Sequence, residues 1–451
     1  MPHLILSVNA CRQCRRISDC SPSAWHQGVA LWSISFRSGR SASPSLQLEF
    51  PWTPLVISYT DPMIITLGLL LAFTLTIWAG SSSMHSYIGQ VNQLIASHRS
   101  GVARLTGPAQ ASADALAKGG SFYLNSSDNR AWFYEGIGRA GALMQTREFN
   151  QNSAPVAGDV VWISYTASTY QNALNVSTRL TPQKIVVVGF GPQPPSGRQP
   201  FANWVDSLTP WTASDDVTLF GNVLSLWTLE GELAAATARQ SKTLVFWQSI
   251  QTPSGPDRNR HYQNQMFHDR FPQMQPAAAG VLSTAYLNAV GELLDEITKS
   301  ELSQIAAAAI QLTQRRAAGH AATLVVTSHL LPFIGLENNP LFHYVSDPAE
   351  LDAALAQSRF LVHVGYSGVD LELWRRVRLA GAEAVWITGQ LPNQADFSGQ
   401  GDIFIDEHWQ LGDASIPVAG YDVRLLPVSG LAQLFTYELL MRASEQRNSG
   451  R

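Results

Sequence analysis

The sequence predicts two α/β domains in tandem, each with a doubly wound parallel sheet. From residue 84 onward, strand-like and helix-like segments alternate along the chain, which is typical of a parallel sheet with helices on both faces. The same order of segments recurs in the second half, where WISYTAST at 162–169 matches HVGYSGVD at 363–370. Because the preceding strand lies at nearly the same distance in each half, the match indicates an internal repeat.

The spacing of apolar residues predicts the elements of each half. In the first half we expect helices over 84–118, 131–144 and 171–180, and strands over 121–125, 159–164 and 184–190. In the second half we expect strands over 322–327, 341–345 and 382–388, a strand with its turn over 360–368, and helices over 349–357 and 370–381. We place the first domain at 84–300 and the second at 301–451, after a leader over 1–83 that forms no domain.

The leader contains an uncharged segment, MIITLGLLLAFTLTIWAG at 63–80, that is long enough for a membrane span. It makes a poor signal peptide, because no Lys or Arg lies between Ser58 and Met63. Three interpretations stay open: translation that starts at Met84, a membrane anchor, or a cleaved signal. A start at Met84 predicts a cytoplasmic protein. An anchor over 63–80 predicts a single-pass protein whose arginine-rich N-terminus stays inside.

Composition and charge disfavour several classes of function. The net charge is −4, and no basic stripe carries interleaved aromatic residues, so we expect no nucleic-acid partner. All three cysteines, Cys11, Cys14 and Cys20, lie in the leader, which excludes a disulfide framework or a thiolate zinc site from the rest of the chain. Together with His26 they could form a zinc knuckle, but the spacing is irregular. We therefore expect no metal, and a small molecule or a protein as the partner.

A glycine motif at 135–141 raises the alternative of a dinucleotide cofactor. EGIGRAG contains G-x-G-x-x-G, which needs a strand directly before it and an acidic residue at the end of the next strand. The run SFYLN at 121–125 fits the repeat better as the first strand, and it leaves the motif in a helix. Asp159 begins the next strand instead of ending it. We therefore expect no cofactor.

Hydroxyl side chains gather where the strand at 159–164 is expected to end. Ser164, Thr166, Ser168 and Thr169 lie within six residues, just before the predicted helix at 171–180. Ligands of open α/β sheets bind at the carboxyl ends of the strands, and a helix N-terminus offers unpaired N–H groups to a phosphate. We interpret these four hydroxyls as a phosphate-binding turn. The alternative is that one of them merely caps the helix.

This segment resembles the SIS (sugar isomerase) family, whose signature is a strand followed by S-x-S-G-x-T/S-x-E/N. ISYTASTYQN has Ser164, Thr166 and Thr169 at the hydroxyl positions, with Ala167 where Gly is usual. Further similar segments are AGDVVWIS at 157–164, YEGIGRAGALMQ at 134–145 and SGLAQLFTYELLMRA at 429–443. The resemblance implies SIS-type, flavodoxin-like domains that bind a phosphorylated sugar. It also implies a homo-oligomer, since sites of this family are commonly completed across dimers.

The resemblance also implies roles for residues near the first predicted strand. Ser126, Ser127 and Asn129, in the loop after that strand, become candidate phosphosugar-binding residues. Glu135, in E-G-I-G-R, is similar to a proton-transferring Glu of the phosphoheptose isomerases and is the candidate catalytic residue. The alternative for Glu135 is an ion pair with Arg139, four residues on.

The second copy of the motif departs from the family. It keeps Ser367, a candidate phosphosugar-binding residue, and Gly368, but Gly365 replaces the first hydroxyl and Asp370 the last. Because a carboxylate repels a phosphate, we expect this second site to be altered and only the first half to bind tightly.

Three functions remain open from the sequence. The first is an aldose–ketose isomerase that uses Glu135, or a carboxylate expected in a loop such as Glu230 or Glu232, as its acid or base. The second is a non-catalytic sensor of sugar phosphates, which the lack of a position matching the family's catalytic His favours. The third is a membrane-anchored interaction module, which requires that residues 63–80 are translated and inserted.

Overall fold

The computed structural model describes residues 62–445 except 127–128, 198–200, 367, 390–400 and 411. It also describes two short antiparallel strands, β1 (Ile34–Arg37) and β2 (Ser45–Leu48). Side chains are described from residue 82 onward. The chain divides into two units, one of Met1–Ser81 with Gln446–Arg451 and one of Ser82–Glu445. Both large sheets lie in the second unit.

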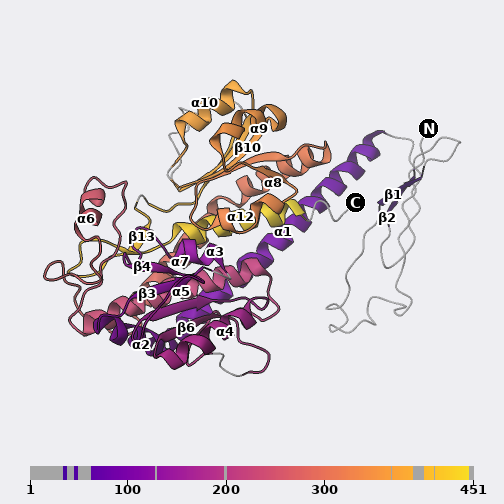
Figure 1. Cartoon of the computed structure of the whole chain (residues 1–451). Helices are drawn as coiled ribbons and strands as arrows, with labels where there is room; N and C mark the ends of the chain where they lie inside the picture. Colours follow the sequence, from indigo (N-terminus) through magenta and orange to yellow (C-terminus); the bar gives the residue numbers. More distant parts are fainter. Residues whose placement is uncertain are drawn as a thin grey trace. The chain divides into compact units, whose positions relative to one another are not determined.

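The first half contains a sheet of five parallel strands in the order β4-β3-β5-β6-β7 (Figure 1). The strands are β3 (Phe122–Asn125), β4 (Thr146–Phe149), β5 (Val160–Ser164), β6 (Val186–Gly191) and β7 (Asn203–Asp206). The helices α2 (Thr106–Ala117) and α4 (Tyr170–Leu180) belong to this half. The strand order changes direction between β3 and β5, so the sheet is doubly wound, and its ligand-binding edge is expected at the carboxyl ends of these two strands.

The second half repeats this arrangement, with five parallel strands in the order β12-β11-β10-β8-β9. The strands are β8 (Ala322–Val326), β9 (Phe342–Tyr344), β10 (Phe360–Gly365), β11 (Glu383–Thr388) and β12 (Ile403–Asp406). The helices are α8 (Leu302–Ala317), α9 (Leu351–Ser358), α10 (Leu371–Leu379) and α12 (Ser429–Glu445). Numbered along the chain, both sheets have the order 2-1-3-4-5, which confirms the predicted fold class of two doubly wound parallel sheets. The domain limits near residue 300 stay a prediction.

Helix α1 (Pro62–Gly101) contains the uncharged segment of the leader and continues through Met84. A short 3-10 turn (Val102–Leu105) separates it from α2, so the helix expected over 84–118 is interrupted. Among the residues whose side chains are described, no helix is long and apolar enough to cross a membrane. The membrane span predicted for 63–80 finds no support there, and the side chains of that segment lie outside the described residues.

The helix predicted over 131–144 is wrong beyond its first turns. Helix α3 (Arg130–Glu135) ends where the glycine motif begins, and Gly138 and Gly141 take positive φ angles of 69° and 79°. At Gly141 the backbone passes close to the second half, because an added Cβ would lie 2.5 Å from the Cβ of Ala414. Glycine is therefore required at 141 both by its φ angle and by this close approach.

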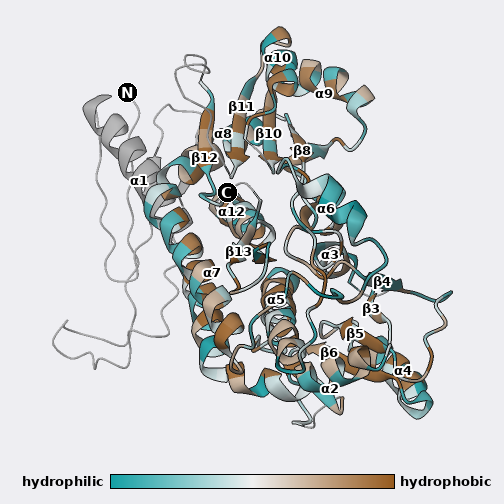
Figure 2. Ribbon diagram, turned by 90° about the vertical axis from the view of Figure 1, so that its left-hand side faces the viewer, coloured by the Kyte–Doolittle hydropathy of each residue, from teal (hydrophilic) through white to brown (hydrophobic). Residues whose placement is uncertain are grey.

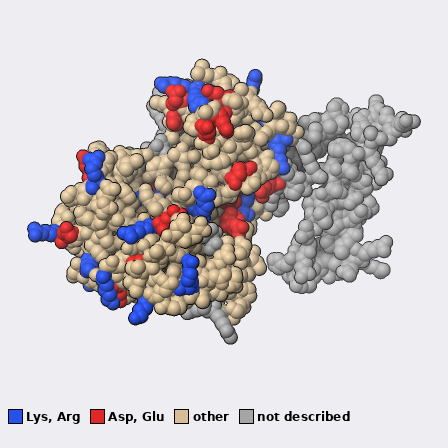
Figure 3. All heavy atoms as spheres, in the orientation of Figure 1, with Lys and Arg blue, Asp and Glu red and all other residues tan. Residues whose placement is uncertain are grey.

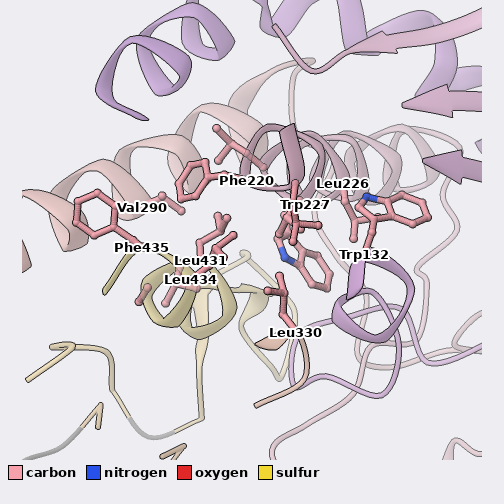
Figure 4. Packing of buried hydrophobic residues seen from close by; sticks show 14 of the residues in the cluster. Trp132, Phe220, Leu226, Trp227, Val290, Leu330, Leu431, Leu434 and Phe435 are labelled. Carbon is pink, nitrogen blue, oxygen red and sulfur yellow. The ribbon is translucent and has the colours of Figure 1, made fainter. Parts of the chain in front are cut away.

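Helix α5 (Asp215–Arg239) lies at the centre of the second unit, and every residue from Val217 to Ala238 is buried. A helix that is buried on all sides must be surrounded by other elements. Figure 4 shows the side chains gathered around it, among them Trp227 from α5, Val290 from α7 (Val281–Ser300) and Phe435 from α12. One face of each central strand, β5 and β10, belongs to this core, whereas the opposite faces pack in two smaller clusters. Figure 2 colours the ribbon by hydropathy. The two halves thus share one core.

A buried ion cluster also joins the halves. The guanidinium of Arg139 contacts the carboxylate of Glu135 at 2.5 Å and also pairs with the carboxylate of Asp413. Its Nη2 atom donates to the hydroxyl of Ser429 at 2.6 Å. Asp413 in turn accepts from the backbone N–H of Val428 and of Ser429, at 3.0 and 2.7 Å. Because the charged side chains are at most 1% exposed, each depends on the others for its solvation.

Replacement of Arg139 by Met should therefore destabilise the protein strongly. The variant keeps most of the side-chain volume but leaves two buried carboxyl groups without their cation, so we expect a loss of about 3–5 kcal/mol in the free energy of unfolding. Urea denaturation measures it. Arg375→Met is the matched control, because Arg375 is 65% exposed and lies 3.6 Å from Glu372, and such a pair contributes less than about 1 kcal/mol. Equal losses in the two variants would contradict the role given to Arg139.

Candidate functional site

The structure brings three of the predicted hydroxyls together in the turn between β5 and α4. The hydroxyl oxygens of Thr166 and Ser168 lie 2.8 Å apart, and those of Thr166 and Thr169 lie 3.5 Å apart. The backbone N–H of Thr166 donates to the Thr169 hydroxyl at 2.9 Å. Ser168 is exposed and the two threonines are half-buried, so the cluster lies at the surface, at the carboxyl end of the central strand. This is the edge where ligands of such sheets bind.

The side chain of Thr169 does not cap helix α4, so capping does not explain a threonine at this position. Thr169 is the N-cap residue of α4, but its side chain makes no hydrogen bond to the helix. At the corresponding position in the second half, Asp370 accepts from the N–H groups of Glu372 and Leu373 at 2.8 and 3.1 Å and caps α10. The N-terminus of α10 thus already holds a carboxylate of the chain itself, whereas that of α4 has no such side-chain cap.

Ala167 stands where the signature of the SIS family, which this segment resembles, has glycine. It is not among the residues with positive φ, whereas Gly368 in the second half has a φ of 67°. The two turns therefore differ in backbone conformation, and the first does not need glycine.

In the second half, the residue that corresponds to Ser164 is not the one that the sequence alignment indicated. Ser164 points to the same side of its strand as Trp162, toward α5, and on β10 the side that faces α8 and α12 carries Val362 and Val364. Val364 therefore corresponds to Ser164. Gly365 cannot simply become serine, since an added Cβ would lie 2.5 Å from Cε1 of His363. Ser367 lies outside the described residues.

The loop after β3 contributes one of its three candidates to this cluster. Asn129 caps α3 by accepting from the N–H of Trp132 at 3.1 Å, and its side-chain Nδ2 donates to the Ser164 hydroxyl at 3.2 Å. Ser126 instead donates to the carboxylate of Glu148 at 2.6 Å. Ser127 lies outside the described residues. Glu148, on β4, is the one exposed carboxylate that this loop contacts among the described residues, and its place was not predicted.

Asn222 is a second residue that the sequence analysis missed. It lies on α5, is fully buried, and its Nδ2 atom donates to the Ser164 hydroxyl and to the carbonyl of Tyr165, each at 2.9 Å. An asparagine inside the apolar run VTLFGNVLSLW was a usable signal, because a buried amide in an apolar helix needs partners. Its partner could not be read from the sequence.

Glu135 lies in the ion cluster with Arg139, as the alternative interpretation predicted. The carboxylate is fully buried, and its second oxygen accepts from the indole N–H of Trp227 at 3.3 Å. Burial raises the pKa of Glu135 to about 7, although the positive charge of Arg139 opposes this rise. Both oxygens are thus engaged away from the hydroxyl cluster, and a catalytic role for Glu135 stays a prediction.

The other two candidate carboxylates, Glu230 and Glu232, were expected in a loop, but both lie on the buried helix α5. Glu230 accepts from the N–H of Leu143 at 2.7 Å, and burial raises its pKa to about 8. Glu232 accepts from the N–H of Gly280 at 2.6 Å and pairs with Arg239. Both therefore hold backbone segments in place and contact none of the clustered hydroxyls.

Neither a metal-binding cluster nor the described cavity includes the predicted site residues. Where side chains are described, no group of three or more His, Cys, Asp or Glu residues is placed to hold a metal ion. On the face shown in Figure 3, basic and acidic side chains are interspersed. A cavity of about 170 Å³ lies between the halves, beside Gly141, Trp247 and Gly412, and none of the predicted site residues lines it.

Comparison with known proteins gives similarity of structure only. No family model matches the sequence, and no curated protein matches it. Solved structures align over most of the chain. The C-terminal domain of glucosamine-fructose-6-phosphate aminotransferase from Francisella tularensis has 11% identity and a TM-score of 0.44, covering 78% of this chain and 96% of its own. A protein provisionally named sugar-binding, from Salmonella typhimurium LT2, has 12% identity and a TM-score of 0.43, covering 81% and 99%.

The raised pKa of Glu230 predicts a pH-dependent stability difference. The buried carboxyl group holds its proton in the folded state more tightly than in the unfolded state, so its contribution is fully present below pH about 4.5 and is lost as the pH rises through about 8. Glu230→Gln keeps an acceptor for Leu143 and cannot ionise. Relative to the wild type, the variant should gain up to about 1.4 kcal/mol per pH unit between pH 5 and 8. A stability difference that is constant over this range in urea titrations would refute the shift.

Proposed function

We propose that this chain binds a phosphorylated sugar at the carboxyl edge of its first sheet, with the phosphate at the N-terminus of α4. The observation that carries the proposal is the cluster of Thr166, Ser168 and Thr169 hydroxyls in front of this helix. These three hydroxyls bond mostly to one another, and they can exchange these bonds for bonds to a ligand. The positive end of the helix dipole adds to the attraction for an anion.

The chemistry of the turn suits a phosphate better than a neutral group. A dianionic phosphate offers only acceptors, and hydroxyl and N–H donors form charge-assisted bonds to it that are stronger than neutral ones. No carboxylate interacts with Thr166, Ser168 or Thr169 in the described structure. Glu148 is held by Ser126, in the neighbouring loop. The sugar itself would extend from the phosphate over the loop after β3, where Asn129 lies.

Binding is proposed for the first half alone. In the second half the carboxylate of Asp370 occupies the helix N-terminus, and Val364 replaces the hydroxyl of Ser164. A phosphate there would meet a negative charge and lose a donor.

The described contacts favour a binding protein over an isomerase. An aldose–ketose isomerase needs a base with a free oxygen near the sugar C2. The carboxylate oxygens of Glu135 are held by Arg139 and Trp227, and its side chain is not exposed. The resemblance to the SIS family supports isomerisation as the second candidate. A panel of hexose, aminosugar and heptose phosphates, tested for isomerisation after binding is shown, separates the two.

The hydroxyls should contribute to binding and little to folding. Thr166→Val removes one donor at nearly constant shape, so we expect the affinity for the best phosphosugar of the panel to fall about tenfold to a hundredfold, because one charge-assisted bond contributes about 1.5–3 kcal/mol. Isothermal titration calorimetry measures this affinity and should give one site per chain.

Thr178→Val serves as the matched control for this substitution. Thr178 lies on α4 itself, is exposed, and bonds only the carbonyl of Leu174. The control should bind like the wild type. An unchanged affinity in Thr166→Val, or a stoichiometry of two equivalent sites, would contradict the proposed function.

A further inference from the structure

The hydroxyl of Ser164 receives two hydrogen bonds from side-chain amides. Nδ2 of Asn129 lies 3.2 Å from its oxygen, and Nδ2 of Asn222 lies 2.9 Å from it. Ser164 is the last residue of β5 and is 1% exposed. The two amides come from elements far apart in the sequence, the cap of α3 and the middle of α5.

The orientation of each amide is determined by its other partner. The Oδ1 atom of Asn129 accepts from the N–H of Trp132, which directs Nδ2 toward Ser164. Nδ2 of Asn222 also donates to the carbonyl of Tyr165, which can only accept. If the amide of Asn222 were rotated, its oxygen would face the carbonyl oxygen of Tyr165. If the amide of Asn129 were rotated, its N–H groups would face the N–H of Trp132. Both amides therefore donate to Ser164.

A serine hydroxyl can accept two hydrogen bonds and donate one. Because both acceptor positions of Ser164 are filled, its proton can only point away from the two amides. Within the described part of the chain, the Ser164 hydroxyl accepts these two bonds and donates none. A buried hydroxyl whose proton has no partner is costly in itself, and a ligand oxygen would remove the cost.

We infer that Asn222, together with Asn129, is a positioning residue that holds the Ser164 hydroxyl as a hydrogen-bond donor toward the ligand. This inference rests on the proposed function and deepens it. A deep hydroxyl that can only donate favours a group rich in acceptors, such as a dianionic phosphate, whose charge strengthens the bond. It discriminates against an ammonium group, which has no lone pair to accept the bond.

The place of Asn222 agrees with a role beyond packing. It is a polar residue in a buried helix, and its Oδ1 atom has no hydrogen-bond partner among the described residues. An amide that leaves one atom unsatisfied in an apolar interior reduces stability. Its two donated bonds both serve the end of β5, where the ligand is proposed to bind.

The test is a double-mutant cycle with inorganic phosphate as the probe. Wild type, Asn222→Leu, Ser164→Ala and the double variant are titrated with phosphate at constant ionic strength, with sulfate and chloride in parallel, and the thermal midpoint is followed. Asn222→Leu should weaken phosphate binding about three- to tenfold. In the Ser164→Ala background it should change the affinity by less than about twofold, because the hydroxyl it positions is absent.

Two further variants separate positioning from folding. Asn129→Ser keeps a good N-cap for α3 but removes the amide donor, so phosphate binding should weaken while the thermal midpoint without ligand stays near that of the wild type. Asn259→Leu removes another buried amide, which bonds only the backbone of Gln248, and should lower the midpoint without changing phosphate affinity.

The outcomes distinguish this inference from the proposed function. If Asn222→Leu weakens phosphate binding by the same factor with and without the Ser164 hydroxyl, Asn222 does not act through Ser164 and the inference is overturned, while the proposed function stands. If phosphate does not stabilise the wild-type protein above chloride, both fail. If Asn222→Leu does not fold, the same cycle with Asn129→Ser decides the question.

Discussion

The guanidinium of Arg139 is the contact on which the arrangement of the two halves depends. It lies between Glu135 of the first half and Asp413 of the second, with all three side chains removed from solvent. None of these groups could stay charged in the interior without the others. The close approach at Gly141 and the shared core around α5 join the same two halves. The protein therefore consists of two sheets that share one large core, and the opposite face of each sheet packs in a smaller cluster of its own.

This arrangement explains why two halves with the same strand order have different chemistry. Helix α5 closes the first half and fills the shared core, and from there Asn222 reaches the end of β5. In the second half the corresponding side of the central strand carries Val364, and Asp370 caps the next helix. In the first turn the hydroxyls bond mainly to one another and the helix has no side-chain cap, whereas in the second turn the carboxylate of Asp370 caps the helix. The repeat keeps its fold and differs at the site.

Local patterns in the sequence predicted the fold, because buried parallel strands are short apolar runs and the repeat doubled the signal. The same patterns located the hydroxyl turn. They failed where a long-range contact decides the structure. The segment after Glu135 was expected to be helical, but Gly138 and Gly141 have positive φ angles and the chain turns toward the second half. Asn222 was missed because only the packing of α5 against β5 brings it to Ser164. The alignment of the two halves placed the helix caps correctly and the strand faces one residue out. Both central strands are buried at every position, so their sequences show no alternation from which the two faces could be told apart.

The most direct test of the central claim is a crystal structure of the protein with the best-binding phosphosugar of the panel. We predict that its phosphate lies at the N-terminus of α4, with oxygens about 2.5–3.2 Å from the hydroxyls of Ser164 and Thr166. No phosphate should bind at the N-terminus of α10, where the carboxylate of Asp370 caps the helix. A phosphate bound in the cavity beside Gly141, or at α10, with the hydroxyl turn unchanged from the free protein, would contradict the account.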